Sequence, residues 1–121
     1  MLKKLWWLPI GNAPEIPADQ LKKWLEDEKS LQFIDSRTEL EYRQGTLQSA
    51  KLAPVTGLPG AIDRLDLDPN IPVIVLCLSG HRSLPGTRLL RARGFEAYSL
   101  KGGLTAWKLK GYPVQTPQNH T

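Results

Sequence analysis

The feature that most constrains this chain is the segment of residues 73–83, in which a short apolar run leads into the only cysteine of the sequence, Cys77. The run is rich in β-branched residues and is followed by the polar, glycine-containing residues 78–82, a pattern that predicts a buried strand and then a loop. From Ser83 onward the pattern is helical. This order places Cys77 at the carboxyl end of a buried strand and in front of a helix N-terminus.

Cys77 therefore has surroundings that suit a nucleophile. The unpaired N–H groups and the dipole of a helix N-terminus favour a negative charge, and Arg82 adds a positive charge five residues along the chain. Both effects favour the thiolate, which is the nucleophilic form of cysteine. A lone cysteine is more often a small buried apolar residue, but the strand-end position together with Gly80, Arg82 and Ser83 favours the nucleophile.

The rest of the chain alternates apolar runs with amphipathic segments, and Thr38 and Glu41 have the spacing of a helix capping box. Alternating strands and helices predict an α/β fold with a parallel sheet covered on both faces. Ligands of such sheets bind beyond the carboxyl ends of the strands, where Cys77 falls. We expect strands at residues 31–34, 49–52, 73–76 and 97–100, and helices at 18–28, 38–44, 83–93, 104–110 and, after a short loop, within 55–67.

Length and charge limit the classes of function. The 121 residues suffice for one domain. A net charge of +4 and a pI of about 9.4 lean towards anionic partners, but the basic residues are scattered and form no stripe with aromatics that would indicate nucleic-acid binding. One cysteine excludes an internal disulfide and a multi-cysteine zinc site. We therefore expect no metal or other cofactor, and a cytoplasmic protein, since nothing requires an oxidising compartment.

The ends of the chain are expected to lie outside the main domain. Residues 12–17 are interpreted as a proline-bearing linker. The apolar run before it is interrupted by Pro9 and is too short to cross a bilayer, so we expect no transmembrane segment. Trp6 and Trp7 either lie on the domain surface or contact a partner or a membrane surface. The sequence thus divides into an arm and linker at 1–14, a domain at 15–114 and a tail at 115–121.

Four separated blocks carry further sequence motifs. They are residues 33–37 with Glu41, Tyr42 and Gly45; Leu47, Ala50 and Pro54; the loop 77–83; and residues 101–103 with Ala106 and Trp107. In this order and spacing they resemble the single-domain rhodaneses, a family of sulfurtransferases, over about residues 15–114. The resemblance implies a rhodanese-like three-layer α/β fold, with a parallel sheet of about five strands and helices on both faces.

The resemblance also implies a reaction. Cys77 would take a sulfane sulfur from a small anionic donor such as thiosulfate or from a persulfide, hold it as a cysteine persulfide, and pass it to cyanide or a thiol. A persulfide on another protein is a further partner that this chemistry allows. In this interpretation Cys77 is catalytic, Asp35 is a supporting residue, and the substrate-binding residues are Leu78, Ser79, Gly80, His81, Arg82, Ser83 and Arg37.

Some roles stay open at this level. Arg82 either points at the donor or braces the loop, and Arg37 either contacts substrate or, with Asp35, braces loops at a strand end. Uncharged Leu78 and Ser79 follow the cysteine where many thiosulfate-using relatives carry charged or polar residues. This difference favours a persulfide donor over thiosulfate.

Two other functions compete with sulfur transfer. A rhodanese-like binding or sulfide-sensing module would present Cys77 to a partner with little turnover, and the arm with Trp6 and Trp7 favours it. A phosphatase is the weaker alternative, because the related phosphatase and arsenate reductase subfamily has five residues between cysteine and arginine, whereas Cys77 and Arg82 are separated by four. Thr46 stands where histidine is common in the family, and we expect the fold to tolerate it.

Overall fold

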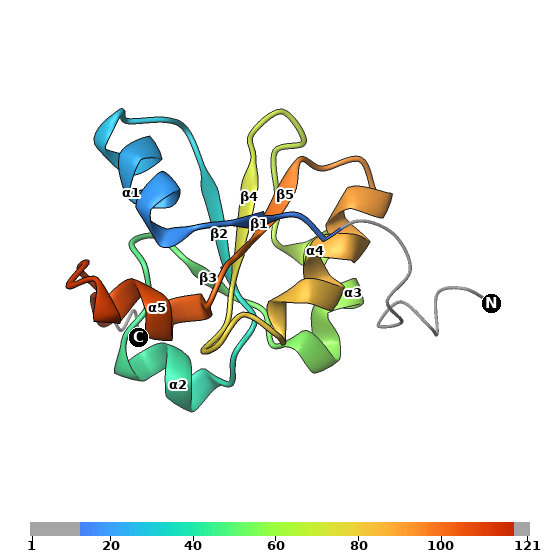
Figure 1. Ribbon diagram of the computed structural model, residues 1–121. Helices are drawn as coiled ribbons and strands as arrows, with labels where there is room; N and C mark the ends of the chain where they lie inside the picture. Colours follow the sequence, from blue (N-terminus) through green and yellow to red (C-terminus); the bar gives the residue numbers. More distant parts are fainter. Residues whose placement is uncertain (1–12, 118–121) are drawn as a thin grey trace.

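The structure, a computed structural model, describes residues 13–117, so the predictions for Trp6 and Trp7 lie outside the described residues. Its centre is a sheet of five parallel strands in the order β1-β5-β4-β2-β3 (Figure 1). In chain order the elements are β1 (Glu15–Ile16), α1 (Ala18–Glu26), β2 (Gln32–Asp35), α2 (Glu39–Gln44), β3 (Lys51–Leu52), the 3-10 helix η2 (Val55–Gly57), α3 (Leu58–Arg64), β4 (Val73–Leu76), α4 (Ser83–Ala92), β5 (Ala97–Leu100) and α5 (Gly103–Leu109).

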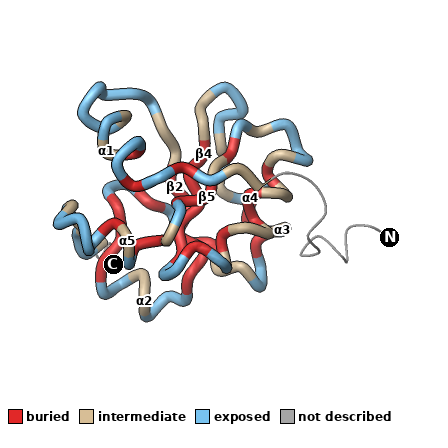
Figure 2. Tube along the Cα trace, in the orientation of Figure 1, coloured by how far each residue is buried: buried red, intermediate tan, exposed pale blue. Residues whose placement is uncertain are grey.

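The central strand β4 is apolar throughout because both of its faces are covered. Ile74 and Leu76 belong to the core beneath α1 and α5, whereas Val73 and Val75 belong to the core beneath α3 and α4. Buried residues follow the sheet, and exposed residues lie on the outer sides of the helices (Figure 2). The predicted three-layer α/β fold is confirmed.

The start of α2 also follows its sequence signature. The Thr38 hydroxyl accepts a hydrogen bond from the backbone N–H of Glu41, and the Glu41 carboxylate accepts one from the N–H of Thr38. This reciprocal pairing satisfies two N–H groups that a helix start otherwise leaves unpaired. It also fixes Glu41 at the end of the molecule where the β4 strand finishes.

The predicted linker at residues 12–17 is wrong at Glu15 and Ile16, which form β1. The N–H of Ser99 donates to the Pro14 carbonyl and the N–H of Lys101 donates to the Ile16 carbonyl, both at 2.9 Å. A strand of two residues is too short to show alternation in its side chains, and backbone hydrogen bonds to β5 define it. The adjoining helix α1 also ends earlier than predicted, at Glu26.

The segment after α5 returns to the body of the fold. Thr46 and Gln115 exchange two backbone hydrogen bonds of 2.9 Å in an antiparallel bridge. The indole N–H of Trp107 donates to the Pro113 carbonyl at 2.8 Å. These contacts anchor the chain as far as the first residue of the predicted tail. Within residues 13–117, no helix has the length and apolar character needed to cross a membrane.

Candidate active site

Cys77 directly follows β4, at the carboxyl edge of the sheet, and only 1% of its surface is exposed. The loop after it turns back so that the backbone N–H of Gly80 donates to the Cys77 Sγ at 2.9 Å. This turn requires a φ of +94° at Gly80, and a Cβ there would lie 2.9 Å from the Gly102 nitrogen. The loop therefore aims a backbone N–H at the sulfur, an arrangement that favours negative charge on it.

Ser83, the first residue of α4, lies on the buried side of the sulfur. Its Oγ is 3.4 Å from the Cys77 Sγ, and Ser83 is fully buried. The same hydroxyl is hydrogen-bonded to the hydroxyl of Ser99 on β5, which is also fully buried. The buried position of Ser83 favours contact of its hydroxyl with the Cys77 sulfur over the predicted contact with a bound substrate. Ser99 was not identified from the sequence, because one serine in the short run of β5 gives no distinct signal.

The outward side of the loop is formed by Leu78, Ser79 and His81, all of which are exposed. The Ser79 hydroxyl lies 3.1 Å from the Nδ1 of His81. These side chains face solvent, so they are the loop residues available to an incoming molecule. Leu78 makes part of this surface apolar, with 42% of it exposed.

The start of α5 holds the base of the loop. The N–H of Leu104 donates to the Cys77 carbonyl and the N–H of Thr105 donates to the Leu78 carbonyl, both at 2.9 Å. Gly103 makes this approach feasible, because a Cβ on it would lie 2.3 Å from the Leu78 oxygen and 2.5 Å from the Cys77 oxygen. Gly103, the first residue of α5, therefore lets two backbone segments meet beneath Cys77.

Arg82 connects the loop to α2. Its guanidinium donates two hydrogen bonds of 2.8 Å, one to each carboxylate oxygen of Glu41. The hydrogen bond from Arg82 is the main reason that the pKa of the Glu41 carboxyl falls from 4.5 to about 2, and the same pairing raises the pKa of Arg82. Of the two predicted alternatives, this geometry favours Arg82 as a brace of the loop.

Asp35 and Arg37 form a second, fully internal ion pair. Asp35 is completely buried and Arg37 is 3% exposed, and the closest of their hydrogen bonds is 2.8 Å long. Arg37 also donates to the Gly45 carbonyl, and the Thr46 hydroxyl donates to Asp35 at 2.8 Å. The geometry thus favours a structural role for Arg37 over the predicted substrate contact. Thr46 fits the buried site by donating a hydrogen bond to the carboxylate.

The ion pairs of both arginines limit the positive charge that the site offers to an anion. Arg82 and Arg37, the two arginines that the sequence assigned to the site, are each engaged by a carboxylate. Beside Cys77 the loop presents the backbone N–H of Gly80 and the exposed side chains of Leu78 and Ser79. Within residues 13–117, no cluster of three or more His, Cys, Asp or Glu side chains could hold a metal ion.

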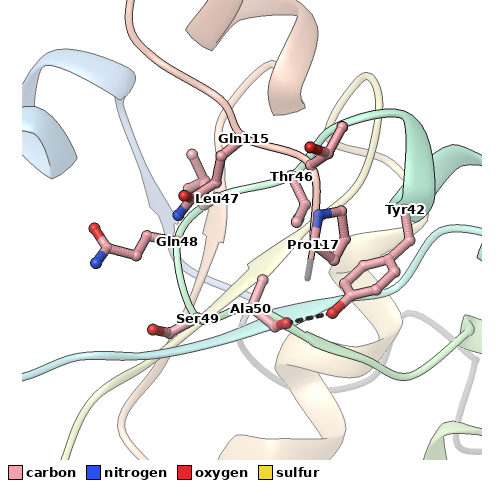
Figure 3. A pocket seen from close by; sticks show the side chains of 9 residues that line it. Tyr42, Thr46, Leu47, Gln48, Ser49, Ala50, Gln115 and Pro117 are labelled. Atoms are coloured by element: carbon pink, nitrogen blue, oxygen red, sulfur yellow. Dashed lines mark hydrogen bonds between the residues drawn. The ribbon is translucent and has the colours of Figure 1, made fainter. Parts of the chain in front are cut away.

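Two cavities lie away from the Cys77 loop. One, of about 370 Å³, is lined by residues around the Thr46–Gln115 bridge, among them Tyr42, whose hydroxyl donates to the Ala50 carbonyl at 2.9 Å (Figure 3). The other, of about 450 Å³, lies between α1 and residues 113–115. Neither is lined by a residue of the segment 77–83.

Comparisons with known proteins identify the family to which the chain belongs. The family model of the rhodanese-like domain matches residues 17–110. A sulfurtransferase of Allochromatium vinosum is 30% identical over 105 residues, which cover 86% of this chain and 96% of that protein. A rhodanese-like domain protein from Staphylococcus aureus superposes with a TM-score of 0.75 at 29% identity, over 87% of this chain and 99% of its own. A thiosulfate sulfurtransferase from Pseudomonas aeruginosa superposes with a TM-score of 0.77 at 26% identity, over 88% of this chain and 21% of that one.

The family assignment rests on the match to the family model and on the similarity to a sulfurtransferase. The matched region spans the sheet from β2 to β5 and includes the loop that carries Cys77. The sulfurtransferase of Allochromatium vinosum is covered almost completely by the alignment. The chain therefore belongs to the rhodanese family and has a sulfurtransferase family role.

Proposed function

We propose that this protein transfers sulfane sulfur through a persulfide on Cys77. The observation that carries the proposal is the position of the Cys77 Sγ at the carboxyl end of β4, with the Gly80 N–H directed at it. A donor of this kind stabilises the negative charge on sulfur that nucleophilic attack requires. The same sulfur is a good leaving group when the charge returns to it.

The reaction consists of two displacements on sulfur. The Cys77 thiolate attacks the outer sulfur of the donor, a new S–S bond forms, and the donor's own bond to that sulfur breaks. With thiosulfate, the electron pair leaves on sulfite; with a persulfide, it leaves on a thiolate. In the second step cyanide or a thiolate attacks the outer sulfur of the Cys77 persulfide, and the electron pair of the broken bond returns to Sγ. Thiocyanate or a new persulfide is released.

We further propose that persulfides are better donors than thiosulfate. Thiosulfate is a dianion, and the guanidinium groups of Arg82 and Arg37 already neutralise Glu41 and Asp35. The exposed Leu78 adds apolar surface next to the sulfur. The reacting S–S⁻ group of a thiol persulfide is a monoanion, and it is joined to an organic group that suits such a surface. Thiosulfate is the donor for comparison, because one of the similar structures is a thiosulfate sulfurtransferase, that of Pseudomonas aeruginosa.

Steady-state kinetics test the proposal. Initial rates are measured with glutathione persulfide or thiosulfate as donor and cyanide as acceptor, with Cys77→Ser as the control. We expect parallel lines in double-reciprocal plots, because a covalent intermediate separates the two substrates. We also expect a higher kcat/KM for the persulfide and no enzyme-dependent rate with Cys77→Ser. Sulfur uptake from either donor without turnover to cyanide would instead identify the binding or sensing module.

A further inference from the structure

We propose that Ser99 is a positioning residue, which holds the Ser83 hydroxyl so that it donates a hydrogen bond to the Cys77 Sγ. Three elements meet at this point: the end of β4, the first residue of α4 and the middle of β5. The effect on sulfur transfer rests on the function proposed above. The effect of the hydrogen bonds on the reactivity of the Cys77 thiol does not depend on that function.

The sheet fixes Ser99 beside the strand that carries the cysteine. Ser99 pairs in register with Val75 on β4, two residues before Cys77. On β5 it shares a face with Ala97, which packs in the core beneath α3 and α4, and α4 begins with Ser83. The backbone of Ser99 is held by its hydrogen bond to the Pro14 carbonyl. Both hydroxyls are fully buried, so no solvent competes for their hydrogen bonds.

The protonation state of Cys77 sets the direction of these hydrogen bonds. The Ser83 hydroxyl has two partners, the Cys77 Sγ and the Ser99 hydroxyl, and Ser99 has Ser83 as its side-chain partner. In the thiol form, the Cys77 S–H donates to the Ser83 hydroxyl. In the thiolate form the sulfur has no proton, so Ser99 donates to Ser83, Ser83 donates to sulfur and every hydroxyl proton is used. The second arrangement favours negative charge on the sulfur.

Negative charge is present on Sγ at two stages of the proposed reaction. It is there before the thiolate attacks the donor, and it returns when the acceptor removes the outer sulfur. A hydroxyl that is already aligned stabilises this charge without reorganising. Ser99 strengthens the Ser83 donor because hydrogen bonds in a chain polarise one another. Substitution of Ser99 should therefore change the reactivity of the sulfur, although its hydroxyl is hydrogen-bonded to Ser83 and not to Cys77.

The chain provides a matched control in Thr87. This residue is also fully buried, and its hydroxyl donates to the backbone carbonyl of Ser83 at 2.8 Å. Thr87→Val removes a buried hydroxyl beside Ser83 without touching the link from Ser99 to the sulfur. Ser99→Thr keeps a hydroxyl at the original position, so it should restore what Ser99→Ala loses.

The experiment is the rate of iodoacetamide alkylation of Cys77 as a function of pH, in folded protein. For Ser99→Ala we expect the midpoint of the profile to move upward by about half a pH unit, the order expected for one weakened hydrogen bond. Thr87→Val should keep the wild-type midpoint and Ser99→Thr should recover it. A midpoint for Ser99→Ala equal to that of wild type would overturn the proposal.

A double substitution tests the order of the chain. If Ser99 acts only through Ser83, adding Ser99→Ala to Ser83→Ala produces no further shift, because the intermediate donor is already gone. If the double variant shifted the midpoint by the sum of the two single shifts, Ser99 would not act through Ser83. In sulfur transfer to cyanide, Ser99→Ala should lower kcat about threefold and leave the KM of the donor unchanged. A wild-type protein that accepts no sulfur would overturn the proposed function, while the alkylation profile would still decide the role of Ser99.

Discussion

Glu41 and Arg82, 41 residues apart in the chain, are joined by two parallel hydrogen bonds of 2.8 Å. Glu41 also completes the capping box of α2 through Thr38, so one carboxylate holds both a helix start and the loop that carries Cys77. The side chains of Glu41 and Arg82 are 26% and 38% exposed, respectively. A partly buried bidentate pair of this kind stabilises a fold more than an exposed one.

The first prediction concerns the charge of Glu41. Glu41→Gln keeps an oxygen for the Thr38 N–H but removes the charge that Arg82 binds. We expect the free energy of unfolding to fall by about 1 kcal/mol, after allowance for solvent screening. Urea denaturation measures it. Glu39→Gln is the control, because Glu39 forms only an exposed pair with Arg43 on the same helix, and it should cost less than about 0.5 kcal/mol. Equal losses for the two variants would contradict the prediction.

The second prediction is the acid dependence of this pair. The pKa of Glu41 is about 2 in the folded protein, below the ordinary value of 4.5, mainly because Arg82 donates to it. The stabilisation is therefore fully present above about pH 4.5 and is lost as the pH falls towards 2. The difference in unfolding free energy between wild type and Glu41→Gln should shrink across this window. Denaturation at pH 6, 4 and 3 measures it, and a constant difference would refute the assignment.

A third prediction separates the two roles considered for Arg37. Removing this side chain leaves the Asp35 carboxylate buried without its charged partner. Arg37→Ala should destabilise the fold by roughly 3 to 5 kcal/mol. A residue that only bound the donor would show the opposite behaviour, with unchanged stability and a raised KM for the donor. Chemical denaturation and donor titrations of the same preparation distinguish these outcomes.

The fourth prediction tests the contact beneath the loop. At Gly103 an added Cβ would meet the carbonyls of Leu78 and Cys77 at 2.3 and 2.5 Å, so Gly103→Ala must displace the loop. We expect sulfur transfer to fall at least about tenfold and stability to fall by roughly 2 to 3 kcal/mol.

Gly94 is the matched control for this substitution. It also has a positive φ, of +94°, but a Cβ there would meet nothing within 4 Å. Gly94→Ala should therefore cost only about 1 kcal/mol of backbone strain and leave sulfur transfer unchanged. A Gly103→Ala variant as active as Gly94→Ala would show that the loop does not depend on this close approach.

Features encoded by neighbouring residues could be predicted from the sequence. The apolar run of β4, the position of Cys77 at its end and the capping box of Thr38 and Glu41 each depend on a few consecutive residues. Local patterns of this kind determine which segments become strands or helices. The fold class followed from their alternation.

Features created by long-range contacts could not be predicted in this way. Glu41 was identified as part of a helix cap and of a sequence motif, but not as the partner of Arg82, because nothing local links the two residues. Strand β1 was missed because its two residues are defined by backbone pairing with β5. Ser99 gave no signal, since its hydrogen bond joins β5 to the first residue of α4, 16 residues earlier in the chain. Such contacts appear only once the chain is folded.

The most direct test of sulfur transfer through Cys77 is the intact mass of the protein. Wild type and Cys77→Ser are incubated with glutathione persulfide or thiosulfate, freed of donor, weighed by mass spectrometry and weighed again after addition of cyanide. We expect wild type to gain the mass of one sulfur atom and to lose it to cyanide, with the persulfide loading faster than thiosulfate. Cys77→Ser should gain nothing. A wild-type protein that takes up no sulfur from either donor, or a Cys77→Ser variant that takes it up equally, would contradict the persulfide mechanism.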